Sequence, residues 1–358
     1  MSLAVTVLKN SAVLLLFLLF ISCGTKNKEY ANNVFPYSQF PQEKELKGEV
    51  IELDTALFRY PFRIRIEGDK AIVLDLHGSD YYGHLFQYPS FRYLSSFGRR
   101  GDSPLEMLSM ENFRLHNHTF WTLDANKSEL TRLDFSSSGD SLLREETVAL
   151  DEDILRPLDF AIYNDTTFVI PDYSGESRFL KVDCKGKLIE KIGTIPTTNK
   201  KALQEARPAL AQAWRSFLDY NSHNSVLATV TQLGEVVEIY NLKDSTHVIR
   251  VGEYDEPEFK VSDGYGIPTG IMGFSDVQVT DDAIYAVFHG TSFKDIARQS
   301  GRLSDGGKYI YVFSLKGEPL CKYVLDHYIY GIWVDEVTKT IMATDVNNDQ
   351  PILKFSFG

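Results

Sequence analysis

The sequence predicts an all-β protein in which four-stranded antiparallel sheets repeat six times around a closed ring. From residue 46 onward there is almost no helical periodicity, but many short runs rich in Val, Ile, Tyr, Phe and Thr end at Gly, Asn or Asp turns. These runs recur as units of four strands. The last unit has only three strands, and one strand-like segment precedes the first unit. Four-stranded sheets repeated around a ring form a β-propeller, here with six blades.

The N-terminal residues 1–22 are typical of an export signal. One charge, Lys9, is followed by an apolar run from Ala12 to Ile21 and then by Cys23. A helix that crosses a bilayer needs about 20 apolar residues, so this run is too short to span one, and we expect it to be cleaved. The alternatives are an ordinary signal peptide with a chance cysteine and an uncleaved anchor.

The residues FISCGTK around Cys23 resemble the lipobox of bacterial lipoproteins, in which signal peptidase cuts before a cysteine whose thiol carries diacylglycerol. The resemblance implies that Cys23 is lipidated and that acyl chains, at about 0.8 kcal/mol per buried CH₂, hold the protein on the outer membrane. Residues 23–45 are polar, contain proline and lack a period, so we expect a flexible tether. No acidic run follows Cys23, which favours the periplasmic side over the cell surface.

The remaining residues, 46–358, are expected to form one domain. Its six units begin with apolar strands at Phe62, Phe113, Leu158, Phe217, Phe274 and Tyr330. In each unit a turn opens the second strand, near Gly68, Asn117, Asp165, Asn224, Asp282 and Thr338. The sixth unit reaches Gly358 after three strands, which leaves one sheet edge unpaired. We therefore expect the strand Gly48–Leu53 to complete the last blade and close the ring.

One linker carries a family resemblance. FGRRGDSPLEM, from Phe97 to Met107, resembles the FGxxGxGPxEF linker of lipoproteins with a TolB-like six-bladed domain, and residues 46–358 as a whole are similar to propellers of the TolB-like and NHL type. The sequence departs from this linker at Asp102 and Ser103, which stand in place of the second glycine. The resemblance implies the six-bladed fold. Kelch Gly-Gly pairs do not recur from unit to unit, and WD dipeptides and sialidase boxes are absent from the sequence, which disfavours those propeller classes.

Composition excludes several function classes. The 358 residues are 43% hydrophobic, 24% charged and 13% aromatic, which is a globular composition. The formal charge is -12 and no Lys/Arg stripe stands out, so neither nucleic acid nor anionic lipid is expected as a partner. The 3 cysteines lack zinc-site spacing. Cys184 and Cys321 fall in units that are not neighbours, so we expect both thiols to be unpaired.

The long insertions fall on one face of the predicted ring. Antiparallel order places each turn between the second and third strands of a blade on the same face as the links between blades. Residues 98–112, 193–216, 252–273 and 289–307 all lie there. Loops on a rigid scaffold often bind ligands, so we expect a site at this mouth; the alternative is that the loops only cap the ring.

A helix is predicted within one of these insertions, over residues 200–215. Pro208 interrupts it, and Thr197, Thr198 or Asn199 is expected to cap its start. Two roles are open for this segment. It either forms a lid over the mouth or packs against the ring through its apolar residues.

Two sets of side chains are candidates for a site at this mouth. Aspartates recur after the second strand of a blade, at Asp75, Asp124, Asp172 and Asp345. They either ligate a divalent cation such as Ca²⁺ or cap their own turns as Asx-turns. Residues suited to anions or rings are Arg99, Arg100, Arg156, Arg215, Tyr265, His289 and Arg302. Each of these is alternatively a contact that fixes its loop.

We expect a non-catalytic, lipid-anchored, monomeric protein that binds a protein or glycan of the cell envelope through this face. No GxSxG motif or other catalytic signature is present in the sequence, and no cofactor is expected apart from a possible divalent cation. The alternative is an enzyme with its site at the mouth, either a metal-dependent, lactonase-like hydrolase or a carbohydrate hydrolase or lyase. A purely structural role in an assembly is a third class.

Overall fold

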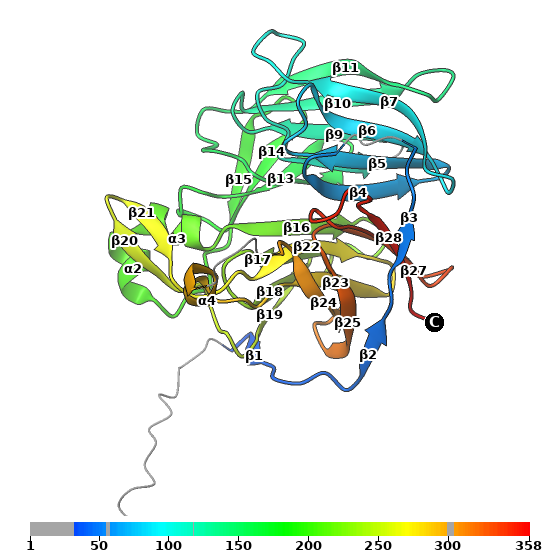
Figure 1. Cartoon of the computed structure of the whole chain (residues 1–358). Helices are drawn as coiled ribbons and strands as arrows, with labels where there is room; N and C mark the ends of the chain where they lie inside the picture. Colours follow the sequence, from blue (N-terminus) through cyan, green and yellow to red (C-terminus); the bar gives the residue numbers. More distant parts are fainter. Residues whose placement is uncertain (1–31, 55–57, 117, 299–303) are drawn as a thin grey trace, which may run out of the picture. The chain divides into compact units, whose positions relative to one another are not determined.

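The computed structural model describes residues 32–54, 58–116, 118–298 and 304–358, and these form six antiparallel blades (Figure 1). The first strand of each blade contacts the first strand of the next, and that of the sixth blade contacts that of the first. The predicted fold class, an all-β six-bladed propeller, is therefore confirmed. The signal segment 1–22 and Cys23 lie outside the described residues.

Each blade runs through four consecutive strands, except the last. Blade 1 consists of β4 (Pro61–Glu67), β5 (Lys70–Asp75), β6 (Tyr81–Gln87) and β7 (Arg92–Arg99). Blade 2 consists of β8 (Asn112–His116), β9 (Thr119–Asp124), β10 (Glu129–Phe135) and β11 (Leu142–Ala149). Blade 3 consists of β12 (Ala161–Asn164), β13 (Thr167–Pro171), β14 (Phe179–Asp183) and β15 (Leu188–Ile192).

The second half of the ring follows the same order. Blade 4 consists of β16 (Ser216–Asn221), β17 (Val226–Thr231), β18 (Val236–Asn241) and β19 (Thr246–Val251). Blade 5 consists of β22 (Phe274–Val279), β23 (Ala283–Phe288), β24 (Gly307–Ser314) and β25 (Pro319–Ile329). Blade 6 begins with β26 (Ile332–Asp335), β27 (Thr340–Thr344) and β28 (Ile352–Ser356).

The missing strand of blade 6 comes from the start of the domain. β3 (Glu49–Ile51) pairs antiparallel with β28, with Val50 opposite Leu353, and Figure 1 shows the blue strand beside the red one. This is the predicted closure. It covers the edge of β28, which would otherwise present unpaired backbone groups.

Two further strands precede β3 in the segment that was expected to be a flexible tether. β1 (Val34–Pro36) pairs parallel with β19 of blade 4, and β2 (Glu43–Leu46) pairs parallel with β25 of blade 5. Leu46 is buried. The expected boundary at residue 45 therefore does not match the pairing, because the chain joins the sheets from Val34 onward.

The outermost strand of a blade is less buried than the strands inside it. In blade 3, β13 is buried throughout, whereas the outer strand β15 is mostly exposed. Aromatic rings fill the spaces between and within sheets, as in the stacked pair Phe113 and Phe120 with centroids 5.0 Å apart. Large flat rings suit the wedge-shaped gaps between blades, which explains the aromatic content.

The insertions lie on the predicted face. Between β15 and β16 come α2 (Lys200–Glu205) and α3 (Arg207–Ala213), and between β19 and β22 a hairpin of β20 (Phe259–Ser262) and β21 (Tyr265–Pro268). α4 (Phe293–Arg298) follows β23. The helices that the described residues form are too short or too polar to cross a membrane.

Candidate functional site

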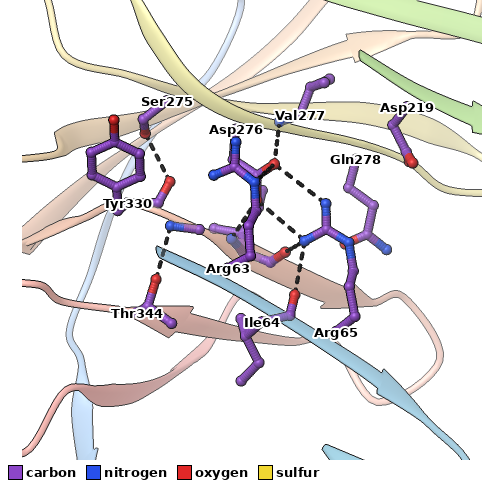
Figure 2. A network of polar contacts seen from close by, with 12 residues as sticks. Arg63, Ile64, Arg65, Asp219, Ser275, Asp276, Val277, Gln278, Tyr330 and Thr344 are labelled. Atoms are coloured by element: carbon purple, nitrogen blue, oxygen red, sulfur yellow. Dashed lines mark hydrogen bonds and ion pairs between the residues drawn. The ribbon is translucent and has the colours of Figure 1, made fainter. Parts of the chain in front are cut away.

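Charged side chains, not an open channel, occupy the centre of the ring. Arg65 on β4 forms two hydrogen bonds with Asp276 on β22, of 3.2 and 3.3 Å, and Arg63 forms an ion pair with the same carboxylate at 3.3 Å (Figure 2). The Arg63 guanidinium also lies 4.3 Å from the ring centroid of Phe217 on β16. Blades 1, 4 and 5 thus meet in the middle of the molecule.

A second part of this network joins blades 2, 3 and 4. Arg114 on β8 donates to Asp159 at 2.7 Å and to the carbonyl of Leu218 at 2.6 Å. The other Asp159 oxygen accepts the backbone N–H of Leu218 at 2.9 Å. These groups are buried, so their charges are stable only because they pair with one another and with backbone groups.

The buried carboxylates differ in their pKa. Burial raises the pKa of Asp276, but Arg63 and Arg65 outweigh it and hold the pKa below its usual value. For Asp159 and Asp219 burial dominates, and the pKa of each lies above its usual value. Because these charged groups are buried and pair with one another across blades, the network connects the blades and is not exposed to a ligand.

The four recurring aspartates cap turns and do not converge. Asp75 accepts the N–H of His77, two residues on, at 3.1 Å, and Asp172 accepts those of Ser174 and Ser177, both at 2.8 Å. Asp75 also accepts the N–H groups of Arg59 and Tyr60 in the preceding link, at 2.9 and 2.7 Å. Asp124 and Asp345 make equivalent bonds within their own turns. Within the described ranges, no three His, Cys, Asp or Glu side chains are grouped to hold a metal ion. The geometry favours the Asx-turn interpretation.

A hollow of about 300 Å³ lies on the elaborated face above blades 3 and 4. We call it the arginine hollow, because two of the predicted residues, Arg156 and Arg215, line it together. Its other lining residues are Leu155, Leu158, Tyr173, Pro208, Gln212, Leu233, Gly266 and Pro268. They come from the link before blade 3, the turn after β13, α3, the turn after β17, and the hairpin. The lining is thus mainly apolar with a few convergent polar groups, as in small-molecule sites.

The helical segment builds one wall of this hollow. Asn199 caps α2, where its side chain accepts the N–H of Ala202 at 3.0 Å, and Pro208 lies in the first turn of α3, as its fixed φ favours. Ala211, Ala213 and Trp214 pack with Val236 and Ile249 of blade 4. The predicted helix is confirmed as two short helices that pack against the ring.

Two glycines allow the walls to approach closely. A Cβ on Gly266 of β21 would lie 2.2 Å from the carbonyl oxygen of Ala209, and one on Gly175 would lie 2.4 Å from that of Arg207. Gly175 also has a φ of +79°, which favours glycine. The Gly266 N–H donates to Gln212 at 3.2 Å and ties the hairpin to α3. The walls are therefore held by backbone contacts.

Two charged groups of the hollow have no described hydrogen-bond or ion-pair partner. In the part of the chain that the structure describes, the guanidinium groups of Arg156 and Arg215 have neither an ion pair nor a hydrogen bond, and both residues are exposed. The Tyr173 hydroxyl is buried and lies beside the backbone N–H of Ser216. Burial raises the pKa of Tyr173, and Arg215 lowers it in part.

A smaller hollow of about 100 Å³ adjoins the first and shares Arg215 and Leu233 with it. His289, another predicted residue, lines this hollow with Asp305 and Tyr330. Burial lowers the pKa of His289, partly offset by Asp305. The two hollows together form the mouth that the sequence predicts.

The remaining predicted residues lie elsewhere. The Arg100 guanidinium donates to the Leu76 carbonyl at 2.9 Å and lies 4.0 Å from the Tyr82 ring centroid, which fixes its loop. Arg99 pairs with Glu106 at 3.4 Å. Tyr265 is 57% exposed on β21 beside the arginine hollow. Arg302 lies outside the described residues. Cys184 and Cys321 are free, as predicted.

Tyr173 and Gln212 are not among the residues predicted from the sequence. Tyr173 directly follows Asp172, a residue that the repeat itself singles out, so its place after the second strand was a usable signal. Gln212 has no such signal, because only the packing of α3 against the hairpin brings it into the hollow.

Fold and mouth together define a six-bladed β-propeller with its insertions on one face. The sequence matches the model of the TolB-like 6-blade propeller-like family over residues 39–337, and the chain therefore belongs to this family. No curated protein matches the sequence.

Solved structures with the same fold come from species of Bacteroides. A B. fragilis protein described as exported aligns with a TM-score of 0.56 at 13% identity, over 90% of this chain and 98% of its own. A member of the duf4221 family from B. vulgatus aligns with a TM-score of 0.54 at 10% identity, over 88% and 96%. An auxiliary nutrient binding protein from B. ovatus aligns with 0.52 at 10% identity, over 84% and 70%. At these identities the similarity concerns the fold.

Proposed function

We propose that this protein is a non-catalytic binding protein of the cell envelope, anchored by lipid at Cys23, which binds its partner through the face that carries the insertions. The observation that carries this proposal is the arginine hollow, a partly apolar recess with two unpaired guanidinium groups on the one elaborated face. Rigid rings with loops on one face are suited to recognition.

The surface around the hollow supports binding. Large apolar side chains are exposed on the links and turns of this face, at Leu105, Leu155, Tyr254, Val261, Tyr265 and Ile267. Exposed apolar residues away from this face include Val337, at 93%, and Leu143, Ile189 and Leu320 near the starts of outer strands. Apolar side chains that surround a recess are typical of an interaction site.

Two further considerations agree with this role. The nutrient-binding protein of B. ovatus has the same fold, so binding of an envelope nutrient or glycan is compatible with such a scaffold. The four recurring aspartates are engaged with backbone N–H groups, which supports a role that does not depend on a shared metal.

The test is affinity capture with the full chain, using an envelope extract and a glycan panel. We expect the Tyr265→Ser, Ile267→Ser double variant to lose the captured partner, and the Val337→Ser control on the opposite face to keep it. Capture should be unchanged by EDTA. Capture lost on chelation, or unaffected by the double variant, contradicts the proposal.

The anchor is tested separately. Labelled palmitate should be incorporated into the wild type and not into Cys23→Ala, and the variant should leave the membrane fraction. A Cys184→Ala control should behave as wild type, since that thiol lies within a blade.

A further inference from the structure

We propose that the arginine hollow binds an organic anion, a carboxylate or phosphate group carried on a small apolar body. This inference rests on the proposed function and specifies the chemistry that the site recognises. Three observations on the described residues carry it: the pair of guanidinium groups, the amide group of Gln212 and the apolar remainder of the wall.

The positive charge of the hollow is the first argument for an anion. The protein has a formal charge of -12, so a long-range field does not attract anions to it. Yet Arg156 and Arg215 line one recess without a carboxylate paired to either in the described chain. Burial and Asp124 raise the pKa of Glu111, and Arg156 lowers it only in part, so Arg156 is not committed to this carboxylate by an ion pair. Planar guanidinium groups bind carboxylate and phosphate through paired hydrogen bonds.

The backbone of Arg156 allows a clean test of its side chain. Its φ is +46°, in the left-handed region, as it is for eight other non-glycine residues of the described chain, and Pro157 follows it. Glycine adopts this φ freely, so Arg156→Gly removes the guanidinium group without straining the backbone.

The remaining wall supplies one polar side chain and an apolar surface. The Gln212 carbonyl is used by Gly266, which leaves its amide N–H groups for a ligand. Leu155, Leu158, Pro208, Leu233 and Pro268 make the rest of the wall apolar.

Size and polarity together select the ligand class. A hollow of about 300 Å³ is at the lower end of small-molecule sites. Inorganic phosphate would leave the apolar wall in contact with water, and a neutral apolar molecule would leave the guanidinium groups without a partner. A small molecule with both parts satisfies the whole lining.

Isothermal titration of the full chain in detergent tests this directly. The probes are phenylbutyrate, phenyl phosphate, the neutral phenylbutanol and inorganic phosphate. We expect at least one of the two organic anions to bind about tenfold or more tightly than phenylbutanol and inorganic phosphate, since a charge-assisted hydrogen bond contributes about 1.5–3 kcal/mol. The tighter of the two identifies carboxylate or phosphate as the preferred group.

The variants locate the site. Arg156→Gln and Arg215→Gln should each weaken the anion about tenfold or more. Arg156→Gly should weaken anion binding to the same extent. Its unfolding temperature should be that of the wild type or higher, so the loss of binding cannot be attributed to a loss of stability. Arg92→Gln, on β7 and outside the hollow, is the matched control and should bind as wild type.

Two results overturn the inference: neither organic anion binds more tightly than phenylbutanol, or both hollow variants bind the anion as wild type does. Failure of the proposed function is distinct from this. Partner capture that depends on Tyr265 and Ile267 but not on Arg156 or Arg215 would retain the binding face and reject the anion site.

Discussion

Asp276 of blade 5 and Arg65 of blade 1 face each other with two parallel hydrogen bonds of 3.2 and 3.3 Å, although blade 6 separates their blades in the ring (Figure 2). The same guanidinium donates to the carbonyl of Ile332 in blade 6 at 2.7 Å. One buried ion pair therefore connects three blades.

Asp276→Ala should destabilise the fold strongly. The change leaves the buried Arg63 and Arg65 without their carboxylate, and removal of one partner of a buried pair costs about 3–5 kcal/mol. Urea unfolding followed by fluorescence gives the free energy. Asp69→Ala, an exposed carboxylate on a turn of blade 1, is the control and should change little. Equal unfolding curves for the two variants would disprove the role of the network.

Stability should decline as the pH falls below about 6.5, the unperturbed pKa of histidine. Burial lowers the pKa of His84, partly offset by Asp75, so between the folded and the unfolded pKa the unfolded chain binds more protons than the folded one. Stability therefore rises with pH through this window and is lost on acidification, by at most about 1.4 kcal/mol per pH unit for one such group.

His84→Gln should flatten this dependence, because glutamine does not titrate. The measurement is the free energy of unfolding at several pH values between neutral and mildly acidic. His223→Gln, whose side chain is 79% exposed, should keep the wild-type slope. A slope that is the same in all three proteins would show that His84 does not contribute.

Gly266→Ala should distort the arginine hollow. The added Cβ would meet the Ala209 carbonyl oxygen at 2.2 Å, so the hairpin and α3 must separate, at a cost of about 1–3 kcal/mol. We expect weaker anion binding and a lower unfolding temperature. Gly264→Asn in the same hairpin is the matched control, because nothing lies within 4 Å of its Cβ and asparagine tolerates its φ of +82°. Similar losses in both variants would contradict the close-contact argument.

Removal of β3 should open the ring. A chain that starts after residue 47 retains β3, whereas one that starts after residue 53 loses the three paired positions beside β28 and the buried Leu53. The second chain should be less stable by about 3 kcal/mol, at about 1 kcal/mol per lost hydrogen bond. Its exposed edge should also increase light scattering. Equal unfolding free energies for the two chains would show that β3 is dispensable.

Most of the fold could be predicted because it repeats. The predicted unit at Phe62 lies one residue after the start of β4, and the one at Phe113 one residue after the start of β8. β1 and β2 were not predicted, because runs of three and four residues are too short to show a periodic pattern. Their pairing depends on the free edges of blades 4 and 5, which are distant in the sequence.

The site could be predicted only in part. The arrangement of blades placed the long insertions on one face, and Arg156, Arg215 and His289 do line its hollows. Local sequence does not reveal distances across blades. It therefore could not show that Arg99 and Arg100 lie outside the hollows that Arg156, Arg215 and His289 line. For the same reason the apolar pattern of β4 and β22 does not indicate that Arg65 pairs with Asp276.

The course of the N-terminal segment around the rim has a mechanical consequence. Before it completes blade 6, the chain is paired with the edges of blades 4 and 5. Tension applied at residue 33 therefore loads β1 first and β2 next, and Tyr37 between them is held by Glu235 at 3.0 Å. β3, the strand that completes the ring, is loaded last. A protein held at its N-terminus in a moving membrane would keep its blades closed until both outer strands had detached.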